Sequence, residues 1–160
     1  MEKKVYELLK KLGIEYNIVE HPALFSGKDN KKYNIKFNSV VCKNLFITNN
    51  KKNQYYLFIL PLEKKINLKL AQEELKESRL SFGDEKTLEE KLKIKSGSVS
   101  VFNIINVEKT DIIFVIDKEI LTYKKVGFHP NINTLTVEFD PKELPKILEK
   151  FNVNYKFIEM

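Results

Sequence analysis

LFITNNKKNQYYLFIL, residues 45–60, contains two apolar runs joined by six polar residues. Residues 45–48 and 55–60 are rich in the aromatic and β-branched residues typical of strands, and the NNKKNQ connection has a suitable length for a hairpin. The second run, YYLFIL, has no polar position, so we expect other parts of the chain to cover both of its faces. The stretch therefore predicts a buried hairpin.

The segments around this hairpin follow the helical and the strand periodicity in turn. The best-marked helix is the last one, because Asp140, Pro141 and Glu143 supply a cap, a first-turn proline and a capping-box acid. We expect helices over 5–12, 67–75, 84–92 and 140–151, and strands over 14–21, 79–82, 111–116, 121–128, 133–139 and 153–157. This order mixes hairpins with crossovers and predicts a mixed α/β or α+β sheet with helices packed on it.

Length and composition favour one domain spanning residues 1–160. The chain has 160 residues, 42% of them hydrophobic and 31% charged, and no stretch approaches the roughly 18 unbroken apolar residues of a membrane span. The charged N-terminus has no export signal and the single Cys42 excludes an intramolecular disulfide, so we expect a cytoplasmic protein. The net charge of +6 rests almost wholly on lysine, which suits phosphate groups, although scattered lysines are also an ordinary solvated surface.

Most standard catalytic signatures are missing. The sequence has no GxGxxG, no GxxxxGK loop and no GxSxG elbow. His21, Cys42 and His129 are widely spaced, so we expect no metal and no cofactor. Cys42 beside Lys43 has the setting of an activated nucleophile, but a cysteine at the edge of an apolar strand is more often a small core residue.

Three stretches carry more polar residues than a plain core needs. CKNLF places Lys43 and Asn44 at the start of an apolar strand, and GFHPN, residues 127–131, makes a turn between two strands. In KSGSVSVFNIIN, residues 95–106, Gly97 lies among serines in a loop whose main-chain amides can point at an oxygen. Each stretch alone also has an ordinary structural explanation.

Together and in this order, these stretches resemble one family, the YbaK/ProX-type prolyl-tRNA editing domains. The resemblance covers nearly the whole chain, through VYELLKKLGIEYNIVEHP, VVCKNLFI, YYLFILPLEKKINLKLA, RLSFGDEKTLEEKLKIKSGSVSVFNIIN and GFHPNINTLTV. The KNLF and GFHPN motifs are more similar to the alanine-editing branch than to the cysteine-editing branch. The resemblance implies a mostly antiparallel sheet that curves toward a barrel with helices packed around it.

The resemblance also implies an activity. Members hydrolyse the ester between a wrong amino acid and the terminal adenosine of proline tRNA, and Lys43 matches their characteristic lysine, which would hold the RNA end. We expect water attack assisted by a hydroxyl of the terminal ribose, with the oxyanion held by main-chain amides from Ser98 to Val101. The candidate catalytic residues are Lys43, Asn44, Gly97 and Ser98, and the candidate substrate-binding residues are Leu45, Phe46, Val99, Ser100, Val101, Phe102, Gly127, His129 and Asn131.

Roles within this set follow from residue chemistry. Asn44 can hold a ribose hydroxyl or the ester carbonyl, and His129 with Asn131 can steady the adenosine. The apolar residues, together with Phe25, can form a small pocket for the amino-acid side chain, although core packing explains them equally well or better. Val101 stands where the family loop commonly has proline, which leaves loop geometry and substrate choice open.

Alternatives remain open from the sequence. The chain could deacylate another mischarged tRNA, carrying cysteine or serine, or could be a tRNA-binding or regulatory module without turnover. The partner we expect is the acceptor end of proline tRNA, with prolyl-tRNA synthetase as a second one. The sequence does not determine the oligomeric state.

Overall fold

The computed structural model describes residues 2–23, 39–95, 99–106, 110–130 and 134–160. The α-helices in these ranges are α1 (Glu2–Lys11), α3 (Leu68–Leu75), α4 (Glu85–Leu92) and α5 (Leu144–Lys150), and the 3-10 helices are η1 (Val101–Asn106), η2 (Lys118–Thr122) and η3 (Pro141–Glu143). The strands are β1 (Tyr16–Glu20), β2 (Val40–Asn49), β3 (Tyr55–Pro61), β4 (Leu80–Phe82), β5 (Ile113–Asp117), β6 (Val126–Phe128), β7 (Leu135–Phe139) and β8 (Tyr155–Ile158).

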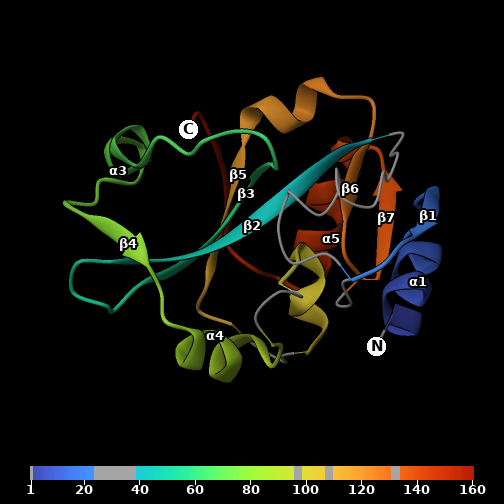
Figure 1. The fold of residues 1–160 in the computed structure, drawn as a ribbon, viewed down its shortest axis with the longest axis horizontal. Helices are drawn as coiled ribbons and strands as arrows, with labels where there is room; N and C mark the ends of the chain where they lie inside the picture. Colours follow the sequence, from blue (N-terminus) through green and yellow to red (C-terminus); the bar gives the residue numbers. More distant parts are fainter. Residues whose placement is uncertain (1, 24–38, 96–98, 107–109, 131–133) are drawn as a thin grey trace.

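The strands form one open, mixed sheet in the order β1-β7-β6-β2-β3-β5-β8, and β4 pairs with β2 outside this path (Figure 1). The pairs β1·β7, β2·β3, β2·β4 and β6·β7 are antiparallel, whereas β2·β6, β3·β5 and β5·β8 are parallel. The expected curved sheet with surrounding helices is confirmed, and the sheet does not close into a barrel.

The predicted hairpin is the centre of this sheet. β2 and β3 pair antiparallel from Cys42 opposite Pro61 to Thr48 opposite Tyr55. The residues of β3 after Tyr55 are all buried, which confirms that both of its faces are covered. β2 is longer than the apolar run 45–48 because it extends back through Lys43 to pair with β6.

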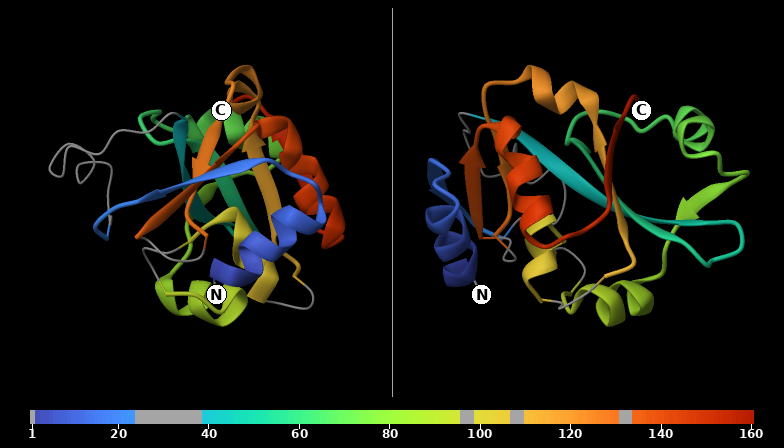
Figure 2. Two further views of the ribbon diagram at one scale, coloured as in Figure 1. Left: turned by 90° about the vertical axis from the view of Figure 1, so that its right-hand side faces the viewer. Right: turned by 180° about the vertical axis from the view of Figure 1, so that it is seen from behind.

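Side chains alternate along β2 and β3 between two apolar clusters. Cys42 and Phe46 belong to the larger cluster, which also includes buried residues of α1, α4, η1 and α5. Ile47 belongs to the smaller cluster, which includes Ala71 of α3 and Met160. Figures 1 and 2 show α1 and α3 at opposite ends of the long axis of the molecule.

Helix caps explain where the helices begin. The side chain of Asn67 accepts a hydrogen bond from Leu70 N (3.0 Å), and that of Asp84 accepts one from Thr87 N (2.8 Å). Asp140 accepts one from Lys142 N (3.0 Å), as predicted, but the helix begins with the 3-10 turn η3 before α5. No helix in the described ranges is long and apolar enough to cross a bilayer.

The expected strand over 121–128 is wrong in its first part. Residues 118–122 form η2, because Asp117 caps it by accepting a hydrogen bond from Glu119 N (3.1 Å), and only Val126–Phe128 form the strand β6. The short helix η1 was also not expected from the sequence. It follows Ser100, whose hydroxyl accepts a hydrogen bond from Phe102 N (3.3 Å).

Candidate functional site

The sheet register brings Lys43 and Gly127 onto one face. Val41 pairs with Gly127, and Gly127 pairs with Glu138 on the next strand. Because side chains two residues apart on a strand point to the same side, Lys43 shares this face with them. We call it the lysine face, and its residues are Val41, Lys43, Gly127, His129, Thr136 and Glu138.

Lys43 is a half-buried cation on this face. Its partial burial lowers the pKa of the ammonium below the ordinary value of 10.5, while Glu63 acts in the opposite direction. Across the described residues, no carboxylate forms an ion pair with it. A cation that is partly desolvated and unpaired is well suited to bind an anionic group of a ligand.

β2 has an open stretch of edge beside Lys43. β6 pairs with the first two residues of β2 and β4 with its last three, both on the edge opposite β3. Phe46 O accepts a hydrogen bond from Gly83 N on this edge (2.9 Å), so Asn44, two residues earlier, directs its main-chain groups the same way. Between β6 and β4 no described strand pairs with this edge, which leaves the Asn44 N–H and C=O facing the opening.

His129 is fixed with one ring nitrogen free. Its Nδ1 donates to the Leu135 carbonyl (3.0 Å), so in the neutral ring Nε2 carries the lone pair. Burial lowers the pKa of His129 below 6.5, the Leu135 hydrogen bond raises it, and the neighbouring His21 lowers it further. His129 is therefore neutral at pH 7 with an acceptor available at Nε2, and it directly follows β6, whose residue Gly127 pairs with Val41.

A buried polar layer supports His129. His21 lies with its ring centroid 6.0 Å from that of His129, and its Nε2 accepts a hydrogen bond from Thr136 Oγ1 (2.8 Å), since its Nδ1 donates to Pro22 O (2.8 Å). In both rings the hydrogen is therefore held on Nδ1. The alternation in TLTVEF predicts that Thr136 faces solvent, yet it is fully buried.

Glu138 and Ser39 form a second part of this layer. Glu138 is 1% exposed, and one of its carboxylate oxygens accepts a hydrogen bond from Ser39 Oγ (2.6 Å). Gly127 packs directly against the layer, because a Cβ there would lie 2.8 Å from Ser39 Oγ and 2.9 Å from Thr136 Cγ2. Glycine at 127 therefore lets the strands bring the polar layer together, and these residues too were missed from the sequence.

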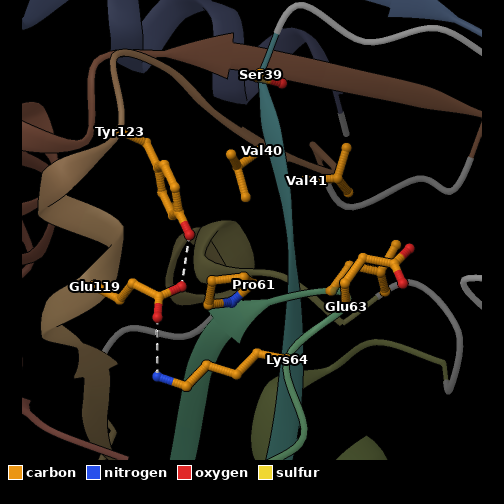
Figure 3. Close-up of a pocket in the computed structure, with 9 residues that line it drawn as sticks. Ser39, Val40, Val41, Pro61, Glu63, Lys64, Glu119 and Tyr123 are labelled. Atoms are coloured by element: carbon orange, nitrogen blue, oxygen red, sulfur yellow. Dashed lines mark hydrogen bonds and ion pairs between the residues drawn. The ribbon is translucent and has the colours of Figure 1, made fainter.

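A pocket of about 560 Å³ adjoins the lysine face at the ends of β2 and β3. In Figure 3, Val41 and Glu63 lie on one side of β2, whereas Tyr123, Glu119 and Val40 lie on the other. Hydrogen bonds from Tyr123 and from Lys64 lower the pKa of Glu119, and the bond to Glu119 raises the pKa of Tyr123 to about 12. Glu119 is therefore paired with two other residues that line the pocket. Glu63 has no hydrogen bond or ion pair with a described residue.

The other candidate residues on β2 are Asn44, Leu45 and Phe46, and of these only Leu45 lies on the same face as Lys43. Asn44 points to the opposite face, where its Oδ1 is buried without a described hydrogen-bond partner. Leu45 shares the face of Lys43 and packs on the smaller cluster. Phe46 is buried in the larger cluster and stacks on Tyr55 (ring centroids 5.1 Å apart).

The candidates of the Gly97 loop are only partly described. Gly97 and Ser98, like Phe25 and Asn131, lie outside the described residues. Val101 and Phe102 are fully buried in the larger cluster, and Val99 packs against it, so the structure does not bring the described apolar candidates into one pocket with Leu45. The Ser100 amide donates to Asn103 Oδ1 (2.6 Å), which corrects its assignment as an oxyanion donor.

Cys42 has the environment of a core residue. It is 5% exposed, and burial raises the pKa of its thiol, with the charge of Asp117 adding to the effect. A protonated, buried thiol is a poor nucleophile, so the structural interpretation of Cys42 holds. In the described part of the chain, no three His, Cys, Asp or Glu side chains gather to hold a metal ion.

Comparison with known proteins assigns the chain to one family. The model of the aminoacyl-tRNA editing domain matches residues 21–147. The prolyl-tRNA editing protein ProX of Acetoanaerobium sticklandii is 32% identical over 159 residues, which cover 99% of this chain and 97% of that protein. The prolyl-tRNA synthetase associated domain-containing protein 1 of Danio rerio is 27% identical over 152 residues, which cover 94% of this chain and 82% of that protein.

Solved structures show the same fold. A crystal structure of a candidate trans-editing enzyme for prolyl-tRNA synthetase superposes with a TM-score of 0.69 at 18% identity, covering 99% of this chain and 96% of that chain. A hypothetical protein superposes with a TM-score of 0.73 at 19% identity, covering 96% of this chain and 97% of that chain.

Proposed function

The chain belongs to the family of aminoacyl-tRNA editing domains, and on this premise we propose that it is a trans-editing hydrolase that deacylates mischarged proline tRNA. The similarity to a ProX protein over almost the full length supports proline tRNA as the substrate. We propose alanine as the amino acid removed, because KNLF and GFHPN are more similar to the alanine-editing branch. In the cell, the enzyme would act in the cytoplasm alongside prolyl-tRNA synthetase.

One observation carries the proposal: an unpaired, half-buried cation and a neutral histidine share one face beside an open strand edge. The end of an aminoacyl-tRNA has matching chemistry, with a phosphodiester, ribose hydroxyls and an ester carbonyl in succession. Lys43 binds the phosphate as a point charge. His129 Nε2 accepts a hydrogen bond from a hydroxyl of the terminal ribose, which orients that hydroxyl toward the attacking water.

The reaction is hydrolysis of a carboxylic ester. Water attacks the carbonyl carbon while its proton passes toward the ribose hydroxyl, and the carbonyl oxygen becomes an oxyanion. The carbon–oxygen bond to the ribose then breaks, the ribose oxygen takes up a proton, and the free amino acid and the deacylated tRNA leave. Because the substrate supplies one of the acting hydroxyls, the protein contributes mainly positioning and exclusion of bulk water.

The oxyanion needs a donor held in place before the reaction. We propose the Asn44 N–H, which faces the open edge of β2, together with amides of the Gly97 loop other than that of Ser100. In this account the main chain of Asn44, and not its side chain, contacts the ester, because the side chain lies on the opposite face. Leu45 then remains the described candidate for contact with the amino-acid side chain.

The test is a deacylation assay with proline tRNA charged in turn with alanine, cysteine, serine and proline. We expect hydrolysis of the alanyl ester well above background and little hydrolysis of the prolyl ester. Faster removal of cysteine or serine would make the protein a deacylase of that ester instead. Binding of tRNA with no hydrolysis of any ester would make it a tRNA-binding module and would overturn the proposed activity.

A further inference from the structure

We propose that Glu63 binds the α-ammonium of the aminoacyl group, so that the site accepts aminoacyl esters and rejects N-acylated, peptidyl-like esters. This inference rests on the proposed function. It starts from the pocket at the ends of β2 and β3, where Val41 and Glu63 lie on the same side of β2 (Figure 3).

Glu63 is an acceptor without a described partner. It lines the pocket of about 560 Å³, is exposed, and forms no hydrogen bond or ion pair with any described residue. The second pocket carboxylate differs, because Glu119 already accepts from Tyr123 Oη and from Lys64 Nζ (3.4 Å). Of these two carboxylates, Glu63 is therefore the one available to a positively charged donor group of a ligand.

Lys43 and Glu63 have opposite charges and are neighbours. Glu63 raises the pKa of Lys43, yet no ion pair joins their charged groups within 4.0 Å. Val41 is two residues from Lys43 on β2 and lines the same pocket as Glu63. A cation and an anion that lie close together without forming an ion pair can each bind the oppositely charged group of one ligand.

The substrate end carries this pair of charges. The terminal nucleotide has a negative phosphate, the amino acid has a positive α-ammonium, and the ester and ribose separate them. In the proposed complex, the phosphate lies at Lys43, the ester at the Asn44 edge, and the ammonium at the side of the pocket that carries Val41 and Glu63. A charge-assisted hydrogen bond there would fix the amino acid relative to the attacking water.

Recognition of the ammonium has a clear consequence for selectivity. An editing enzyme that acts separately from the synthetase encounters peptidyl-tRNA as well as aminoacyl-tRNA. Both substrates have the same RNA end and the same kind of ester. They differ at the α-nitrogen, which is a cation in one and a neutral amide in the other. A carboxylate at this position favours the cation and leaves the amide ester without its partner.

The test compares an alanyl and an N-acetylalanyl group on proline tRNA, with wild type, Glu63→Gln, Glu63→Asp and the exposed control Glu90→Gln. We expect wild type to prefer the free amine by about tenfold or more in kcat/KM. Glu63→Gln should lose about that factor on the free amine alone, Glu63→Asp should recover part of it, and Glu90→Gln should match wild type. A preference that is unchanged in Glu63→Gln would overturn the proposal.

A binding measurement separates this inference from the proposed activity. Adenosine 5′-monophosphate that carries alanine through a 3′-amide, with a free or an acetylated amine, can bind without reacting. We expect wild type to bind the free amine more tightly, and Glu63→Gln to bind both forms equally. Preferential binding without hydrolysis of charged tRNA would refute the deacylase but retain the role of Glu63, whereas equal binding of both forms by wild type would refute that role.

Discussion

At the scale of single residues, the site depends on partners that fix the state of each group. His129 is useful because a carbonyl holds its Nδ1 hydrogen and burial keeps the ring neutral, which leaves one nitrogen as an acceptor. Lys43 is useful because no described carboxylate neutralises it. Neither property is visible in the residue names, since both follow from neighbours on other strands.

The pH dependence of the reaction tests the state of His129. Burial lowers its pKa below 6.5, so the neutral form is present at pH 7 and is lost as the pH falls through that lowered pKa. We expect kcat/KM to decline in acid with an apparent pKa below 6.5. His129→Asn keeps a donor for the Leu135 carbonyl but lacks Nε2, and should remove this dependence and lower kcat by about a hundredfold. The pH profile of kcat/KM for both proteins is the measurement, and an unchanged profile in the variant would exclude His129.

At the scale of elements, β2 organises the molecule and the site together. One strand pairs with β3 along one edge, with β6 and β4 at the two ends of the other edge, and separates the two apolar clusters. The opening between β6 and β4 leaves the main-chain groups of Asn44, next to Lys43, without a strand partner among the described residues. A strand that is paired at both ends holds this short free edge rigidly, which suits a site that works by positioning.

Local patterns predicted most elements because their signals lie within a few residues. The hairpin of β2 and β3 needed only alternation, and the cap at Asp140 needed only capping chemistry. The polar layer of Thr136 and Glu138 was not predicted, because in sequence it is indistinguishable from a solvent face. Its burial depends on the pairing of β7 with β6, a long-range contact that alternation does not report.

The cap of α3 allows stability to be changed without touching the site. Asn67 accepts a hydrogen bond from Leu70 N, and Asn67→Ala should cost about 1 kcal/mol in the free energy of unfolding, or roughly 2–4 °C in Tm. Asn67→Ser should restore most of it, because serine also caps helices. Thermal unfolding and kcat/KM at 25 °C check this, and we expect kcat/KM to be unchanged. A loss of activity in folded Asn67→Ala would mean that α3 takes part in substrate binding.

At the scale of the whole molecule, charge governs how tRNA is approached. The chain carries a net charge of +6, supplied almost wholly by lysine. Lysine attracts phosphates without reading bases, so the charge accelerates encounter and contributes affinity, whereas selection depends on the site itself.

Salt should therefore weaken the reaction through binding. If about three phosphates are neutralised, raising monovalent salt from about 50 to 150 mM should lower kcat/KM roughly tenfold, because counterions released on binding must be released against a higher concentration. The rate at subsaturating enzyme across this range is the measurement, and the maximal rate at saturation should change little. A flat profile of kcat/KM would contradict a phosphate-dominated interface.

The most direct test of the account is Lys43→Ala, with Lys43→Arg and the exposed Lys4→Ala beside it. Burial already lowers the pKa of Lys43, so its charge does not stabilise the folded state and Tm should stay nearly unchanged in Lys43→Ala. We predict that kcat/KM on alanyl proline tRNA falls a hundredfold or more in this variant, roughly 2.7 kcal/mol, that Lys43→Arg recovers only part, and that Lys4→Ala matches wild type. Full activity in folded Lys43→Ala would contradict the proposed site.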